Sequence, residues 1–353
     1  MSAFDHVIGH EAVCRLLESE ASSPAHAYLF IGASGVGKAT VARRFAALVL
    51  DDGRLGETDR VERGLHPDLV LVEPDGRTSL TVDRARATVA RAVLAPVEAN
   101  RKVFLFEEAG AMNDGAANAL LKTLEEPTDS TVFILITESE DDLPATVASR
   151  SRTVLFGRVT DGEIVAALQA DGVERDQAEK VAAASGGRPG LALMLATRPE
   201  VAAFREAWLS VPGRLGEHPG EAFRLADELV SAAKPLLEEL GGRQEGEAEA
   251  AEAQGFDPKL LKERHERERK RASSALHAGG LELLASWYRD AAAAQFGAPV
   301  RNRDLPGADL AGVGARDAVI RARRVLETID ALDANQRPEL AFADLFASLG
   351  TQD

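Results

Sequence analysis

At 353 residues the chain is longer than one ordinary hydrophobic core supports, so we expect two or three domains. Hydrophobic residues make up 45% and charged residues 28% of the sequence, which is typical of a globular protein and argues against disorder. The formal net charge of −16 argues against a protein that coats DNA by itself, because Lys and Arg carry non-specific affinity for phosphate.

A single cysteine, Cys14, excludes an internal disulfide framework and a cysteine-rich zinc module. The first residues show neither the basic nor the apolar segment of a secretion signal, and no later apolar run is long enough to span a bilayer. We therefore expect a cytoplasmic protein with no membrane partner and no bound metal.

Short apolar runs alternate with helical stretches over the first part of the chain. Continuous apolar runs bounded by polar turns predict parallel strands that are buried on both faces, with helices between them. The predicted strands cover residues 27–31, 69–72, 103–106 and 132–136. We therefore expect an α/β nucleotide-binding core over residues 1–157.

The rest of the chain is predicted to be helical. From Asp161 onward, segments rich in Ala, Leu, Glu and Arg with helical spacing replace the strands. Breaks that contain glycine divide this part into a small helical domain over residues 158–204 and a larger one over residues 205–353. Within the larger domain, residues 241–255 are acidic and poor in bulky apolar side chains, which predicts a mobile loop. The mixed charges of residues 259–271 favour a solvated helix face over a DNA-binding patch.

A glycine-rich loop follows the first predicted strand and leads into a helix. Residues 32–40 read GASGVGKAT, which is the G-x-x-x-x-G-K form of a phosphate loop in its strand–loop–helix setting. Its glycines let backbone N–H groups and the helix N-terminus face phosphate oxygens, and its lysine can reach the β and γ oxygens. A glycine turn that carries a lysine by chance is the less favoured alternative. The candidate nucleotide-binding residues of this loop are Gly32, Gly35, Gly37, Lys38, Ala39 and Thr40.

The residue after the lysine departs from this motif. A Ser or Thr hydroxyl normally binds Mg²⁺ there, but the position carries Ala39. Thr40 lies about 100° further around the helix, so we do not expect its hydroxyl to substitute. We expect ATP or ADP to bind, with Mg²⁺ weakly held or absent and with inefficient hydrolysis.

Two glutamates follow the third predicted strand. Acidic residues at such a strand end usually hold Mg²⁺ and polarise the attacking water. Glu107 stands where the shorter Asp is usual, and Mg²⁺ demands tight octahedral geometry. Glu108 could still act as a base. Taken alone, these two residues would be better interpreted as a solvated acidic turn. The phosphate loop upstream makes a role at the phosphate site the preferred interpretation.

Several motifs then follow in a specific order. Residues 118–127 read NALLKTLEEP, a predicted strand ends at Thr137, and residues 149–152 read SRSR. This order resembles the AAA+ clamp-loader family of bacterial DNA polymerase III, whose members carry an ALLKTLEEP helix, a polar residue after the next strand and an SRC motif. Residues 5–10 look like the family's segment beside the adenine, and His66-Pro67-Asp68 looks like the turn before its second strand.

The resemblance implies an AAA+ core with a parallel sheet, a small helical lid and an all-α collar, in which residues 332–342 would be among the final helices. It also implies roles by position. Val7 and Ile8 would lie beside the adenine, and Thr137 would stand at sensor 1. The two Walker B positions would be Glu107 and Glu108.

Arg150 occupies the position of the arginine that, in the family, reaches into the ATP site of a neighbouring subunit. The cysteine of the motif is replaced by Ser151, but the arginine is retained. In the lid, an alignment without gaps places the family's sensor 2 arginine on Gly190, with Arg188 two residues early. The segment that holds a four-cysteine zinc module in many members, residues 51–65, contains no cysteine, so we expect no zinc.

Three departures, Ala39, Glu107 and Gly190, weaken the chain's own hydrolytic centre, whereas Arg150, which would serve another subunit, is retained. The resemblance therefore implies a subunit of the delta-prime type, with gamma/tau and delta type subunits as partners, and the sliding clamp and primed DNA reached through the complex. The alternatives are an active gamma/tau-type motor, an independent AAA+ remodelling ATPase, and an interaction module that never binds nucleotide. A salt-bridged surface arginine is the alternative interpretation of Arg150.

Overall fold

The computed structural model describes residues 3–51, 58–74, 80–216, 218–253, 258–334 and 336–351. The chain divides into two compact units, and each is described by itself. The first unit comprises residues 1–172 and 185–191, and the second comprises residues 173–184 and 192–353.

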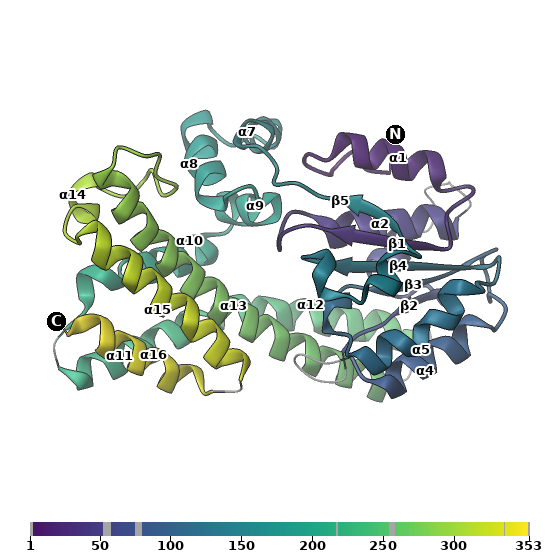
Figure 1. Cartoon of the computed structure of the whole chain (residues 1–353). Helices are drawn as coiled ribbons and strands as arrows, with labels where there is room; N and C mark the ends of the chain where they lie inside the picture. Colours follow the sequence, from purple (N-terminus) through teal and green to yellow (C-terminus); the bar gives the residue numbers. More distant parts are fainter. Residues whose placement is uncertain are drawn as a thin grey trace. The chain divides into compact units, whose positions relative to one another are not determined.

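The first unit contains the predicted parallel sheet (Figure 1). Its strands lie in the order β2, β3, β4, β1, β5, and every pairing is parallel. Four strands match the predicted runs: β1 (Ala27–Ile31), β2 (Leu69–Leu71), β3 (Lys102–Phe106) and β4 (Thr131–Thr137). The fifth, the edge strand β5 (Arg152–Leu155), was not predicted, because it begins with the polar Arg152 and Thr153 and has only two apolar residues.

Helices cover both faces of this sheet, as its apolar strands require. Alternate side chains of β1 point to opposite faces, so Tyr28 and Phe30 pack in one hydrophobic cluster with Phe45, and Leu29 packs in another with Leu120. Figure 1 shows α1 (Glu11–Glu20) and α2 (Lys38–Leu50) on one face, and α4 (Val82–Ala92) and α5 (Asp114–Glu125) on the other. The shorter elements of the unit are α3 (Thr58–Glu62), η1 (Ala109–Ala111), η2 (Glu140–Asp142) and α6 (Ala145–Ala148), and α7 (Asp161–Ala170) follows β5.

The carboxyl ends of the central strands meet at one edge of the sheet. Ile31 at the end of β1 pairs with Thr137 at the end of β4, and Phe106 at the end of β3 pairs with Leu135. The loops that follow these three strands therefore begin side by side, which is where ligands bind in open α/β sheets.

After β5 the described residues form helices and turns without a further strand, as predicted. The helices are α8 (Arg175–Ser185), α9 (Pro189–Thr197), α10 (Pro199–Leu209), η3 (Val211–Arg214), α11 (Pro219–Ala232), α12 (Lys234–Ala253), α13 (Pro258–Gln295), α14 (Gly307–Leu310), α15 (Ala315–Asp333) and α16 (Pro338–Gly350). Trp208 is fully buried in the core of the second unit, with its ring edge-on to Phe342 at 5.1 Å. Gly280 is required there, since a Cβ on it would lie 2.1 Å from Trp208. No helix among the described residues is long and apolar enough to cross a membrane.

The mobile loop predicted for residues 241–255 is wrong as far as Ala253, because α12 continues to that residue. The abundant Ala and Glu are strong helix formers and outweigh the scattered glycines. Gln244 also ties this stretch to α13: its amide donates to Glu268 at 2.8 Å, and Arg269 donates to its carbonyl oxygen at 2.7 Å. Residues 254 and 255 lie outside the described residues.

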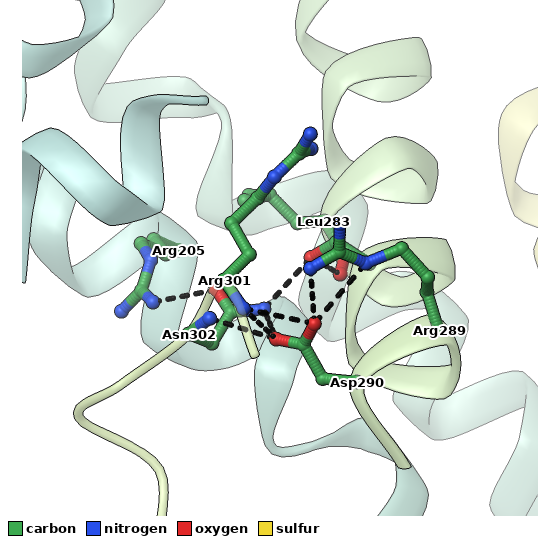
Figure 2. Close-up of polar contacts among 7 residues, drawn as sticks. Arg205, Leu283, Arg289, Asp290, Arg301 and Asn302 are labelled. Carbon is green, nitrogen blue, oxygen red and sulfur yellow. Dashed lines mark hydrogen bonds and ion pairs between the residues drawn. The ribbon is translucent and has the colours of Figure 1, made fainter. Parts of the chain in front are cut away.

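A buried carboxylate on α13, Asp290, organises the loop that follows this helix (Figure 2). It accepts the backbone N–H groups of Arg301 at 3.0 Å and Asn302 at 2.7 Å, and the side-chain amide of Asn302 at 2.8 Å. Arg205 of α10 donates to the amide oxygen of Asn302 at 2.7 Å and to Asp304 at 2.6 and 2.9 Å. The network fixes the loop to two helices, because Asp290 on α13 and Arg205 on α10 both hydrogen-bond to Asn302.

Candidate functional site

The phosphate loop runs from the end of β1 to the start of α2. Gly35 and Gly37 have φ angles of +77° and +106°, which only glycine adopts without strain. Gly37 is the N-cap of α2, and no side chain caps the N–H groups of the first turn. These groups and the positive end of the helix dipole make the loop suited to an anion.

Lys38 is buried within this loop, with only 7% of the residue exposed. Its Nζ donates to the carbonyl oxygens of Gly32 and of Ala33, the latter at 2.8 Å. Burial lowers the pKa of Lys38, and the nearby carboxylate of Glu138 partly opposes that change. The predicted phosphate lysine therefore lies in the loop that it would serve.

The N-terminal segment packs beside the loop. Val7 is partly buried against the same hydrophobic cluster as β1 and α2, and Ile8 is half-buried. The sequence analysis did not single out His10, whose Nε2 lies 2.8 Å from the carbonyl oxygen of Val36 and must carry the proton to donate to it. His10 has a left-handed φ of 59°, an uncommon value for a residue other than glycine. This hydrogen bond links the segment to the phosphate loop.

The turn between α8 and α9 also reaches the loop. A Cβ built on Gly35 would lie 2.9 Å from Cδ of Arg188, so the stem of this arginine covers the loop. The Nε of Arg188 donates to the carbonyl oxygen of Ser185 at 3.0 Å. At Gly190, where the alignment without gaps places the sensor 2 arginine, a Cβ would point into open space, with no contact within 4 Å from other parts of the described chain. The structure thus places an arginine beside the loop two residues before the aligned position.

The side of the loop where Mg²⁺ would bind offers few oxygen ligands among the described residues. Ala39 has only a methyl group, and Thr40 is exposed. Glu107 accepts a hydrogen bond from the Nε of Arg43 on α2 at 2.6 Å. Arg43 also donates to the carbonyl oxygen of Glu62 at 2.8 Å. A methyl group thus replaces the hydroxyl that normally binds Mg²⁺, and a guanidinium group engages one oxygen of the nearby carboxylate, so these residues fit Mg²⁺ poorly.

The other two predicted catalytic positions differ in their surroundings. Glu108 is exposed and lies at the start of η1. Thr137 is buried at the end of β4, and its hydroxyl donates to Asp142 at 2.6 Å. That hydrogen bond, together with the N–H of Ser139 at 2.8 Å, lowers the pKa of Asp142. The Thr137 proton is therefore committed to a carboxylate within the chain, while its carbonyl oxygen accepts the N–H of Gly32 at 3.3 Å.

Arg150 follows α6, and its partners come from α5 and α6. Its Nη2 lies 2.6 Å from Oε1 of Glu125. Its Nη1 donates to the carbonyl oxygen of Thr146 at 2.9 Å and to the hydroxyl of Ser149 at 3.3 Å. About a third of the Arg150 side chain is exposed. The structure thus gathers the predicted loop residues at one edge of the sheet. It holds Arg150 in an ion pair, as the alternative of a salt-bridged surface arginine expects, with a partner, Glu125, that the sequence did not indicate.

The known proteins that resemble this chain include several DNA polymerase III subunits. Residues 9–160 match the family model described as DNA polymerase III, delta subunit. A DNA polymerase III subunit delta' from Pseudomonas aeruginosa is 37% identical over 177 residues, which cover 47% of this chain and 54% of that protein. A subunit delta' from Bacillus subtilis is 37% identical over 37% of this chain and 42% of its own length. The subunit tau of the same organism is 33% identical over 46% of this chain and 30% of its own length.

The chain thus spans about half, or less, of the length of the curated relatives that it matches. Among solved structures, a DNA polymerase III gamma subunit-related protein from Thermotoga maritima is similar over 95% of this chain and 98% of its own, with 16% identity and a TM-score of 0.46.

Proposed function

We propose that this chain, which belongs to the DNA polymerase III clamp-loader subunits through residues 9–160, acts as the delta-prime type subunit of its complex. It would serve mainly as a scaffold and as the donor of an arginine to a neighbouring ATPase site. The observation that carries this proposal is the Arg43–Glu107 ion pair, which occupies the chain's own Walker B carboxylate. A chain that serves another subunit's site needs no hydrolytic centre of its own.

The phosphate loop would bind ATP or ADP through Gly32, Gly35, Gly37 and Lys38. Mg²⁺ would be weakly held or absent, and no zinc is needed. Val7 and Ile8 would lie on the base side. Glu108 would be a possible base at a site without a bound metal. Thr137, at the sensor 1 position, would stabilise the end of β4 through its hydrogen bond to Asp142.

Arg150 would enter the ATP site of the adjacent motor subunit. A guanidinium group there neutralises the charge that develops on the transferred phosphoryl group, which can accelerate hydrolysis by orders of magnitude. Because its side chain is partly exposed and lies at the end of a short helix, Arg150 can exchange its partners without unfolding the core.

The partners would be subunits of the gamma/tau and delta types, with the sliding clamp and primed DNA bound through the complex in the cytoplasm. The net charge of −16 fits a subunit that relies on its partners for most of the contact with DNA. We also propose that the core, lid and collar cover residues 1–157, 158–204 and 205–353.

A gamma/tau-type motor is the second candidate, because the phosphate loop keeps Lys38 and because a tau subunit is among the relatives at 33% identity. An independent remodelling ATPase would form a ring of identical chains. Mass measurement of the purified chain, alone and mixed with gamma/tau and delta type subunits, separates a clamp-loader subunit from the independent ATPase. ATP hydrolysis by the isolated chain separates the delta-prime type from the motor. The proposal expects a hetero-oligomer that forms only in the mixture. A ring formed by the chain alone would contradict it.

A further inference from the structure

The metal side of the phosphate loop carries a guanidinium group where the motif would supply a hydroxyl. Ala39 and Arg43 are four residues apart on α2, so their side chains lie on the same face of the helix, one turn apart. The hydroxyl that would bind Mg²⁺ is missing from this face, and a permanently charged side chain extends from the next turn.

Arg43 is held on this face from two directions. Its Nε lies 2.6 Å from Oε1 of Glu107 at the end of β3, and its Nη1 lies 2.8 Å from the carbonyl oxygen of Glu62 at the end of α3. About a third of each charged side chain is exposed, so the pair adds little to overall stability. Its consequence is local, because the guanidinium group places a positive charge against Oε1 of Glu107, and an incoming Mg²⁺ would have to displace it to gain that oxygen.

The rest of the loop supplies positive charge without a metal. Lys38 is buried in the loop, the N-terminus of α2 faces it, and the stem of Arg188 covers Gly35. Two cations and a helix dipole can compensate much of the charge of a diphosphate group.

We propose that the phosphate loop binds a nucleoside di- or triphosphate independently of divalent cations, and that Arg43 is the residue that makes it so by occupying Glu107. This inference rests on the nucleotide binding proposed above.

Calorimetric titration of the full-length chain with ADP, in excess MgCl₂ and in excess EDTA, tests the inference. The two dissociation constants should agree within about threefold. Binding that is at least about tenfold tighter in MgCl₂ would overturn the inference, as would the absence of ADP binding in both buffers.

The double variant Ala39→Ser/Arg43→Ala restores a hydroxyl donor and releases Glu107. It should bind ADP at least about tenfold more tightly in MgCl₂ than in EDTA. Arg44→Ala is the matched control, since Arg44 is the next residue on α2 but pairs with Glu62 at 3.4 Å and should leave binding indifferent to the metal. If the folded double variant binds ADP equally tightly in MgCl₂ and EDTA, Arg43 is not the residue that excludes Mg²⁺.

These results are independent of the proposed subunit type. A phosphate loop that proves to require Mg²⁺ would leave the effect of Arg150 on a neighbouring subunit untouched. Loss of the Arg150 effect would in turn leave the comparison of MgCl₂ and EDTA unchanged.

Discussion

The guanidinium of Arg150 is ion-paired to Glu125 within its own chain, with 2.6 Å between Nη2 and Oε1. Glu125 is the last residue of α5, and Arg150 follows α6. The arginine proposed to enter a neighbouring ATP site is therefore held at the surface by a carboxylate that competes with phosphate for the same guanidinium group.

Replacing Glu125 by Gln should tighten ATP-dependent assembly with a motor subunit. The pair is partly exposed and worth up to about 1 kcal/mol, so its removal should lower the dissociation constant by up to about fivefold. Analytical ultracentrifugation with the motor subunit measures the change, and Glu126→Gln, one residue further along, is the control. Weaker assembly of Glu125→Gln would show that the pair positions Arg150 instead of competing for it.

The isolated chain should hydrolyse ATP no faster than its Lys38→Ala variant. Ala39 supplies no hydroxyl for a metal, and Glu107 is occupied by Arg43. Phosphate release by highly purified protein, measured beside Lys38→Ala, provides the comparison. Robust turnover that disappears in Lys38→Ala would favour the gamma/tau-type motor.

Asp68 should stabilise the core in a pH-dependent way. Burial by itself would raise the pKa of Asp68, but hydrogen bonds from the N–H groups of Ala99, Glu98 and Val97, at 2.7 to 2.9 Å, overcome this and lower it. A carboxyl group whose pKa is lowered by folding stabilises the fold fully above its ordinary pKa of 3.8, and this contribution is lost as pH falls through the folded value.

Asp68→Asn should therefore reduce the free energy of unfolding by about 2 kcal/mol at neutral pH, and the difference from wild type should shrink below the ordinary pKa. Urea unfolding at several pH values measures it. The control is Asp83→Asn, because the Asp83 side chain is almost fully exposed. A difference in unfolding free energy that does not change with pH would show that the charge of Asp68 does not stabilise the segment 97–99 that it binds.

The buried strands and the phosphate loop could be predicted from the sequence, because their signals are local. An apolar run marks β3, and a glycine pattern with a lysine marks the loop before α2. The edge strand β5 begins with two polar residues and buries only Val154, so its local signal is weaker. The helix through residues 241–253 was missed because its composition, rich in both glycine and helix formers, supports either interpretation.

The contacts that define the site join residues far apart in the chain. Arg43 and Glu107 are separated by 64 positions, and no pattern along the sequence connects them. Arg188 reaches Gly35 although its aligned position is two residues early, because the turn between α8 and α9 places its stem over the loop. Such pairings depend on how strands and turns come together, which single-sequence patterns do not encode.

The central claim is that Arg150 acts on a neighbouring subunit's ATP site, and hydrolysis by the reconstituted clamp-loader complex tests it most directly. Arg150→Ala should still allow assembly at saturating subunit concentrations. It should partly reduce clamp- and DNA-stimulated ATP hydrolysis and reduce clamp loading more strongly, because one of the motor sites loses its arginine. Arg150→Lys should also fail substantially, since an ammonium group lacks the planar guanidinium fork. The control Arg152→Ala, which removes an ion pair with Glu20, should behave like wild type. An Arg150→Ala complex that loads clamps at the wild-type rate would contradict the account and leave Arg150 a structural residue.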